Sequence, residues 1–97
     1  MYLEIININL KSEFGAEDFI EGNRNFEANF MKAQPGLRSR KLGKASDGSW
    51  VVVNEWESES AAQASSAAGR GNPAAGALMG MLDTSKISMQ HFEIIQL

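Results

Sequence analysis

The stretch WVVVNEWESESA, residues 50–61, contains the clearest strand of the chain and the start of a helix. Its three consecutive valines favour a strand, and such a run indicates burial on both faces of a sheet. After the strand the composition changes to Ala and Ser, and Ser60 and Gln63 have the spacing of a helix-capping box. We therefore predict a strand over 50–57 and a helix over 58–69.

The residues before this stretch predict a strand, a helix and a second strand. Apolar and polar side chains alternate over 2–10, as in a strand with one buried face. Phenylalanines recur at helical spacing over 16–34, and Pro35-Gly36 ends that helix. Residues 37–45 predict another strand, and the Asp-Gly pair at 47–48 predicts a hairpin turn into residues 50–57.

The residues after it predict a short helix and a last strand. Asn72 is placed to cap the helix, Pro73 suits its first turn, and its apolar pattern extends to about Leu82. Residues 87–97 predict the final strand. The order βαββαβ is that of a ferredoxin-like α+β domain, with an antiparallel four-stranded sheet and helices on one face. We expect a single domain over 1–97 whose uncovered sheet face needs a partner, which predicts a homodimer.

Composition excludes several classes of protein. The net charge is -3 with both signs mixed along the chain, which argues against nucleic-acid binding. The sequence contains no run of eighteen apolar residues, so it predicts no membrane span, and the charged Glu4 argues against a signal peptide. The chain has no cysteine, so disulfides and thiolate metal sites are excluded. These features fit a cytoplasmic protein.

Three short motifs carry a resemblance to a known family. The strand-to-helix junction at 54–61, Pro35-Gly36-Leu37 before the second strand, and the asparagines of the first strand are similar to the antibiotic biosynthesis monooxygenase-like family. The resemblance implies a homodimeric α/β barrel with a pocket in each subunit. It also implies oxygenation of small aromatic compounds, such as phenols or quinols, without a cofactor.

Some members of that family degrade haem instead. Those proteins use a histidine of the second helix as the iron ligand, together with a first-strand Asn and a third-strand Trp. Here residues 58–82 contain no histidine, although Asn7 or Asn9 and Trp56 match the other two positions. Haem degradation is therefore the less favoured alternative, and we expect neither a cofactor nor a metal.

Asn7 and His91 are the candidate catalytic residues. If Ile6 and Ile8 face the helices, Asn7 and Asn9 point to the opposite face. One of the two amides would orient a phenol or an oxygen derived from dioxygen, unless the pair is solvated at a barrel edge. His91 is the only histidine and would act as general base, unless it is an exposed or structural residue.

Other side chains are candidates for substrate binding. Trp56 offers a flat surface for an aromatic ligand, and Asn54 shares its strand face. Arg40 shares a face with Arg38 if the strand is regular, and the two would hold an anion. The candidates also have structural interpretations as core, dimer-core or strand-protecting residues, and the full substrate-binding set is Asn9, Trp56, Asn54, Phe26, Phe30 and Arg40.

Two functions of different classes remain open from the sequence. The first is a cofactor-independent monooxygenase or quinol oxygenase of small aromatic compounds. The second is a non-catalytic dimer that binds a small apolar ligand or has a stress-response role. The fold alone cannot separate them, because function depends on the site.

Overall fold

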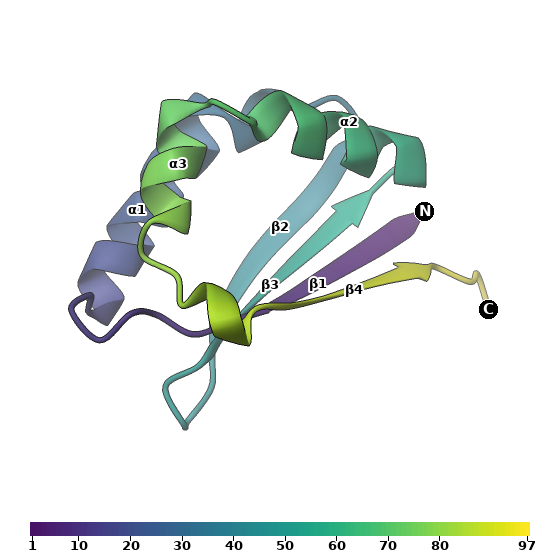
Figure 1. Cartoon of the computed structure of the whole chain (residues 1–97). Helices are drawn as coiled ribbons and strands as arrows, with labels where there is room; N and C mark the ends of the chain where they lie inside the picture. Colours follow the sequence, from purple (N-terminus) through teal and green to yellow (C-terminus); the bar gives the residue numbers. More distant parts are fainter.

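The computed structural model describes all residues from Met1 to Leu97 and contains a four-stranded antiparallel sheet with three helices on one face (Figure 1). This confirms the predicted ferredoxin-like α+β fold. The sheet order is β2-β3-β1-β4, so the first and third strands form its centre. The strands are β1 (Tyr2–Ile8), β2 (Leu37–Lys44), β3 (Trp50–Trp56) and β4 (Ser88–Glu93), and the helices are α1 (Ala16–Asn29), α2 (Glu59–Gly69) and α3 (Pro73–Met79). Two short 3-10 turns, Met31–Ala33 and Thr84–Lys86, complete the structure.

Burial alternates strictly along β3. Trp50, Val52, Asn54 and Trp56 are buried beneath the helices, whereas the residues between them are only partly buried. The run of valines predicts burial on both faces, but within one chain only the helix-facing side is covered. The reason is topological, because both crossover connections place their helices on the same side of the sheet (Figure 1).

The helix-facing residues form two apolar clusters. In one, Phe19 of α1 meets Trp50 edge to face, with ring centroids 5.0 Å apart. The other centres on Trp56 and includes Phe30 and Met31. The two clusters anchor opposite ends of the helical layer to the sheet.

The helix predicted over 16–34 is shorter in the structure. It ends at Asn29, and Phe30 leaves helical geometry with φ of −142°. The Asn29 amide donates to the backbone oxygen of Asn25 at 3.0 Å and to its side-chain oxygen at 2.6 Å. A 3-10 turn over Met31–Ala33 follows, and the chain then reaches β2 through Pro35-Gly36.

The two later helices start at polar caps. The cap of α2 is Ser58, whose Oγ accepts from the Ala61 N–H at 3.1 Å, so the expected capping box at Ser60 is wrong by two residues. The predicted cap of α3 is confirmed, because Asn72 Oδ1 accepts from two backbone N–H groups of the first turn. Neither later helix is apolar and long enough to cross a membrane, nor is α1.

Gly36 connects the end of α1 to β2 in a conformation that other residues rarely adopt. Its φ is +83°, its carbonyl accepts from the Glu57 N–H at 2.8 Å, and an added Cβ would lie 2.7 Å from the Ala61 Cβ. Gly48 in the hairpin turn has a φ of +91° but open space around it. A side chain at Gly48 would therefore meet backbone strain alone, whereas one at Gly36 would meet both backbone strain and steric overlap.

We expect Gly36→Ala to lower the free energy of unfolding by at least about 2 kcal/mol, since it adds overpacking to left-handed strain. Gly48→Ala is the matched control and should cost only about 1 kcal/mol, because it adds strain alone. Urea denaturation of both variants measures the difference. Equal losses would show that the contact with Ala61 relaxes freely.

Candidate functional site

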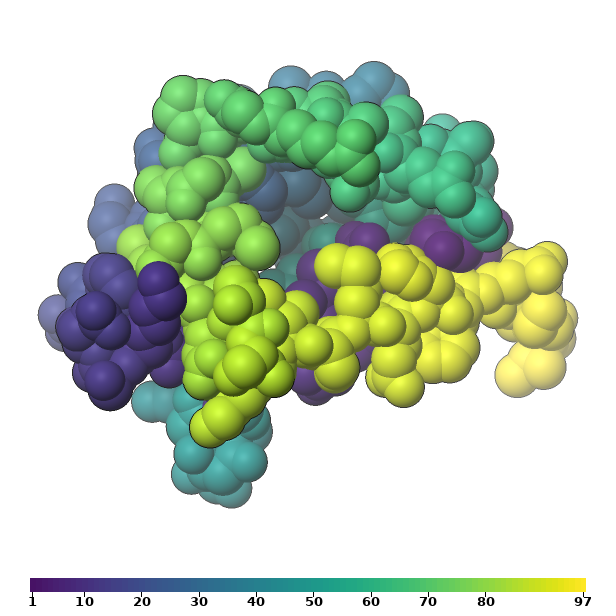
Figure 2. Space-filling view, viewed as in Figure 1, coloured from purple at the N-terminus to yellow at the C-terminus, as the bar shows by residue number.

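A cavity of about 730 Å³ lies between the sheet and the helices. Strands β1 and β3 form its floor, α1 forms one wall, and α2, α3 and the link between them form its roof. Figure 2 shows the hollow between the α2–α3 layer and β4, with β1 at its base. Every residue of β4 is exposed, so the cavity is open along this edge.

Most of the cavity wall is apolar, and its roof is built from small side chains. The apolar lining includes Ile6, Ile8, Phe19, Phe26, Phe30, Met31, Val52, Trp56, Leu78, Leu82 and Met89. The roof contributes Ala62, Ser65, Ser66, Gly69, Ala75 and Gly76. Because these roof residues have short side chains, the space beneath them stays unfilled. The Ala- and Ser-rich composition of 58–69 is thus a cause of the cavity.

The strand register aligns four polar side chains across the cavity floor. Arg40 of β2 lies opposite Asn54 of β3, Asn54 lies opposite Glu4 of β1, and Glu4 lies opposite His91 of β4. We call Arg40, Asn54, Glu4 and His91 the polar row. Cross-strand neighbours of this kind have Cβ atoms about 5 Å apart, so each member can contact the next.

Glu4 is the centre of the polar row. Its Oε1 accepts from Asn54 Nδ2 at 2.9 Å and from Trp56 Nε1 at 3.4 Å. Its Oε2 lies 3.2 Å from His91 Nε2. The Glu4 side chain is only 13% exposed, so these partners replace the water that a buried carboxylate loses. The result is a Glu–His pair at the open side of a mostly apolar cavity.

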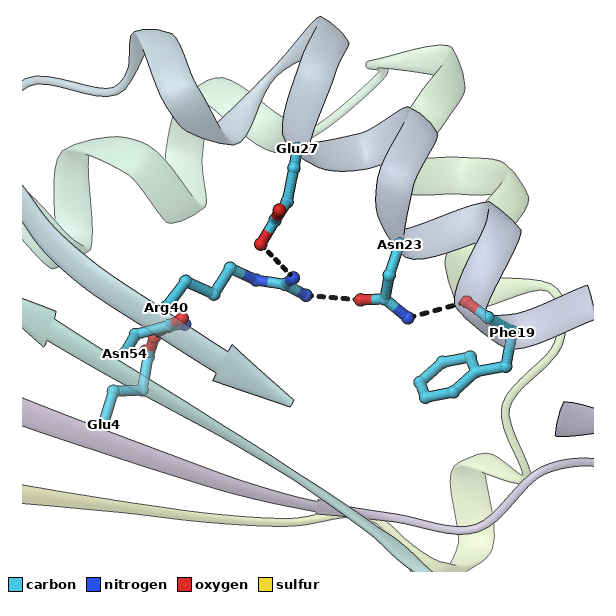
Figure 3. A network of polar contacts seen from close by, with 6 residues as sticks. All are labelled: Glu4, Phe19, Asn23, Glu27, Arg40 and Asn54. Atoms are coloured by element: carbon cyan, nitrogen blue, oxygen red, sulfur yellow. Dashed lines mark hydrogen bonds and ion pairs between the residues drawn. The ribbon is translucent and has the colours of Figure 1, made fainter. Parts of the chain in front are cut away.

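Arg40 occupies the deep end of the polar row (Figure 3). One terminal nitrogen donates to Glu27 Oε1 at 3.0 Å and the other to Asn23 Oδ1 at 2.6 Å. Asn23 in turn donates to the Phe19 carbonyl at 2.8 Å. The guanidinium carbon lies 5.4 Å from the centre of the Phe26 ring, and the Arg40 side chain is 6% exposed. Arg40 therefore ties β2 to α1 across the cavity wall.

The expected pairing of Arg38 with Arg40 on one strand face is wrong. The register shifts between Leu37 and Ser39, so Arg38 falls in an irregularity of β2. Arg38 is exposed and pairs with exposed Glu57 at 3.5 Å. The two arginines therefore do not form an anion clamp.

Tyr2 lies beside the open end of the polar row. Its ring stacks on the His91 ring with centroids 5.7 Å apart. Partial burial, and then the nearby carboxylates of Glu59 and Glu4, raise the pKa of the Tyr2 phenol above its usual range. The environment at the cavity mouth thus disfavours additional negative charge.

The structure brings together most of the residues that the sequence singled out for binding. The cavity is lined by Trp56, Asn54, Phe26, Phe30 and Arg40. His91 does not line it directly but contacts Glu4, which does.

The two first-strand asparagines lie elsewhere. Asn7 is exposed on the opposite face of the sheet, between Val51 and Ser88, because side chains alternate along β1. Asn9 follows the strand and lines a separate hollow of about 280 Å³ near Trp50. Neither residue shares the large cavity with Trp56.

Sequence reasoning missed Glu4 and Asn23. Glu4 carried a signal, because it is the one charge in the alternating series that also contains Ile6 and Ile8 on the helix-facing side. Asn23 carried a weaker one, since it follows Phe19 by four residues and so shares its helix face. Neither signal specifies a partner, which depends on the sheet register.

The residues around the cavity do not fit a haem. The roof, α2 with α3, has no histidine, and His91 is held by Glu4 on the opposite, sheet side. No group of three His, Cys, Asp or Glu side chains is placed to hold a metal ion.

Comparison with known proteins supports the fold strongly. No family model matches the sequence, and no curated protein sequence matches it. Among solved structures, SnoaB from Streptomyces nogalater, a cofactor-independent oxygenase, is 20% identical with a TM-score of 0.76, over 99% of this chain and 95% of that chain. The chain has the fold of the antibiotic biosynthesis monooxygenases.

Two further structures of that kind extend the comparison. A candidate antibiotic biosynthesis monooxygenase from Nitrosomonas europaea is 16% identical with a TM-score of 0.76, over 99% of this chain and 100% of that one. Another from Caulobacter crescentus is 12% identical with a TM-score of 0.80, and the match covers 98% of this chain and 90% of that chain. The resemblance seen in the sequence is thus confirmed at the level of the fold.

Tyr2 is the only tyrosine, so alkaline difference absorbance reports its ionisation alone. We expect a midpoint above the ordinary 10.0. Glu59→Gln should move the midpoint back toward that value, whereas Glu57→Gln, on the same segment but not a cause of the shift, should not. Because the folded-state pKa is raised, folding stability should fall as the pH rises from 10.0 toward it. A midpoint at or below 10.0 would contradict the described surroundings of Tyr2.

Proposed function

We propose that this protein is a cofactor-independent oxygenase of a small hydroxylated aromatic compound. The observation that carries the proposal is the Glu4–His91 pair at the open side of a 730 Å³ apolar cavity. Such a cavity buries a flat ligand of two or three rings, and few polar groups set its orientation. The likeness in fold to SnoaB, itself a cofactor-independent oxygenase, agrees with this chemistry.

His91 is the proton acceptor in the proposed mechanism. Imidazole has an ordinary pKa close to neutrality, which suits a general base. Glu4 holds the ring through Nε2 and stabilises the imidazolium that forms, and Tyr2 stacks on the ring and limits its rotation. Met89, two residues earlier on the same face of β4, lines the cavity, so a ligand in the opening lies next to the pair.

The substrate supplies the electrons in this scheme. Loss of a proton to His91 leaves an electron-rich aromatic anion, which transfers an electron to dioxygen. Recombination forms a carbon–oxygen bond, and the peroxide loses water after His91 returns the proton. For a ring methylene the balance is CH₂ + O₂ → C=O + H₂O. The apolar wall, including Trp56, keeps other water from the reacting atoms.

The test is dioxygen uptake with anthrone-like and quinol substrates and no added cofactor. Removing a general base typically costs a factor of about 10² to 10⁴. We therefore expect His91→Ala to lose at least about 100-fold, and Glu4→Gln to lose activity as well because the ring is then poorly oriented. Substrate oxidation without protein is subtracted as the blank.

Glu13→Gln is the matched control for Glu4→Gln, because Glu13 is exposed in the loop after β1 and should leave the rate unchanged. A catalytic role for Asn7 stays a prediction, and Asn7→Ala with full activity would remove it. Wild-type rates in His91→Ala and Glu4→Gln together would refute the mechanism. Saturable binding of these compounds with no dioxygen uptake would support the non-catalytic alternative.

We also propose that two chains form a homodimer through the uncovered sheet face. That face carries a set of apolar side chains that no helix covers, which we call the bare face: Leu3, Ile5, Val51, Val53 and Phe92. Phe92 is exposed and the other four are half-buried, and apolar patches left at a surface commonly mark an interface. The Val51–Val53 run would then be buried on both faces by two different layers.

We expect Val53→Glu to convert the dimer to a monomer, since the substitution would bury an unpaired carboxylate in the interface. Sedimentation equilibrium at micromolar concentration measures the mass. Glu21→Gln on the exposed side of α1 is a control that should leave the dimer intact. A monomeric wild type would overturn the proposal.

A further inference from the structure

Two buried polar atoms on the cavity floor have no hydrogen-bond partner. They are Nε of Arg40, a donor, and Oδ1 of Asn54, an acceptor. Buried polar atoms in folded proteins nearly always have a partner, so each unpaired one calls for an explanation. Both residues line the cavity, so a small shift of their side chains would bring the two covered atoms into contact with a molecule held there.

The surrounding contacts leave these two atoms without any partner. Each terminal nitrogen of Arg40 donates to one partner, Glu27 or Asn23, so Nε is the only one of its three nitrogens that has no partner. Asn54 Nδ2 donates to Glu4 at 2.9 Å, which fixes the amide with its oxygen unpaired. Glu4 thereby determines that the NH₂ group of the Asn54 amide is paired and its oxygen is not.

The unpaired atoms are also adjacent. Arg40 and Asn54 are directly opposite each other on β2 and β3, on the same helix-facing side (Figure 3). Such residues have Cβ atoms about 5 Å apart. One small group placed between their side chains can therefore contact both.

We propose that Arg40 and Asn54 form a subsite for one neutral hydroxyl group of the ligand. The hydroxyl oxygen accepts from Arg40 Nε, and its hydrogen is donated to Asn54 Oδ1. That the ligand is aromatic rests on the proposed function, whereas the hydroxyl preference rests on the two unpaired atoms. The subsite lies at the deep end of the polar row, away from His91.

The same arrangement disfavours other oxygen groups. A methoxy oxygen accepts from Arg40 but has no hydrogen for Asn54, so one buried acceptor stays unpaired. A carboxylate would meet Glu27, which already neutralises Arg40, and Glu4, one strand further along the row. Arg40 therefore contributes one hydrogen-bond donor here rather than a free positive charge.

The test is a ligand series under nitrogen, which prevents turnover. Dissociation constants of 2-naphthol, 2-methoxynaphthalene and 2-naphthoate are measured at pH 7 from amide chemical shifts of ¹⁵N-labelled protein. We expect 2-naphthol to bind at least about tenfold more tightly than the other two, with a shift of the Asn54 side-chain amide signal. Equal binding of 2-naphthol and 2-methoxynaphthalene, tighter binding of 2-naphthoate, or no binding of 2-naphthol would overturn the proposal.

Two variants locate the preference. Asn54→Leu removes the acceptor and should reduce the preference for the hydroxyl over the methoxy ligand to about twofold or less, whereas Gln63→Leu, at an exposed position of α2 outside the cavity lining, should retain it. If Asn54→Leu does not fold, Arg40→Lys is the second variant. It keeps the positive charge but lacks Nε, so it should also lose the preference. A preference unchanged in folded Asn54→Leu would place the hydroxyl elsewhere and refute the subsite.

This experiment is independent of catalysis. A hydroxyl preference without dioxygen uptake would leave the subsite intact and remove the oxygenase proposal. Dioxygen uptake without the preference would leave the oxygenase proposal intact and remove the subsite.

Discussion

The register between β1 and β3 is the constraint on which the site depends. It places Glu4 opposite Asn54, and the neighbouring registers extend this pair to Arg40 and His91. Because strand side chains alternate with a period of two, a shift of one residue would move Glu4 to the opposite face of the sheet. The apolar alternation of β1 and the burial of Trp50 and Trp56 hold this register in place.

A carboxylate on the buried side of a sheet is costly unless it has partners. The surroundings of Glu4 meet this cost, because Glu4 receives donors from Asn54, Trp56 and His91. Only two buried side-chain atoms of the chain have no hydrogen-bond partner, one on Arg40 and one on Asn54, and both residues line the cavity. Structure and proposed ligand recognition are thus two consequences of one set of hydrogen bonds.

The helical layer decides how much space remains above that row. Phe19, Phe30 and Trp56 anchor it at both ends, while the short side chains of α2 and α3 leave its middle hollow. The same topology leaves the other sheet face without a cover. A ligand cavity on one side and an apolar surface on the other therefore arise from the one-sided placement of the helices.

The sequence by itself determined the order of strands and helices, the fold class, and five residues that line the cavity: Trp56, Asn54, Phe26, Phe30 and Arg40. The order and the fold class follow from periodicity and turn chemistry, which are local, whereas the five residues are indicated by their side-chain chemistry together with the family resemblance. Only the tertiary structure decided that the cavity lies on the helix-facing side, away from Asn7, that Arg38 and Arg40 part at an irregularity of β2, and that Glu4 is the hub of the site. Partners fifty and eighty-seven residues apart, such as Asn54 and His91 for Glu4, are set by strand pairing, which no local pattern specifies.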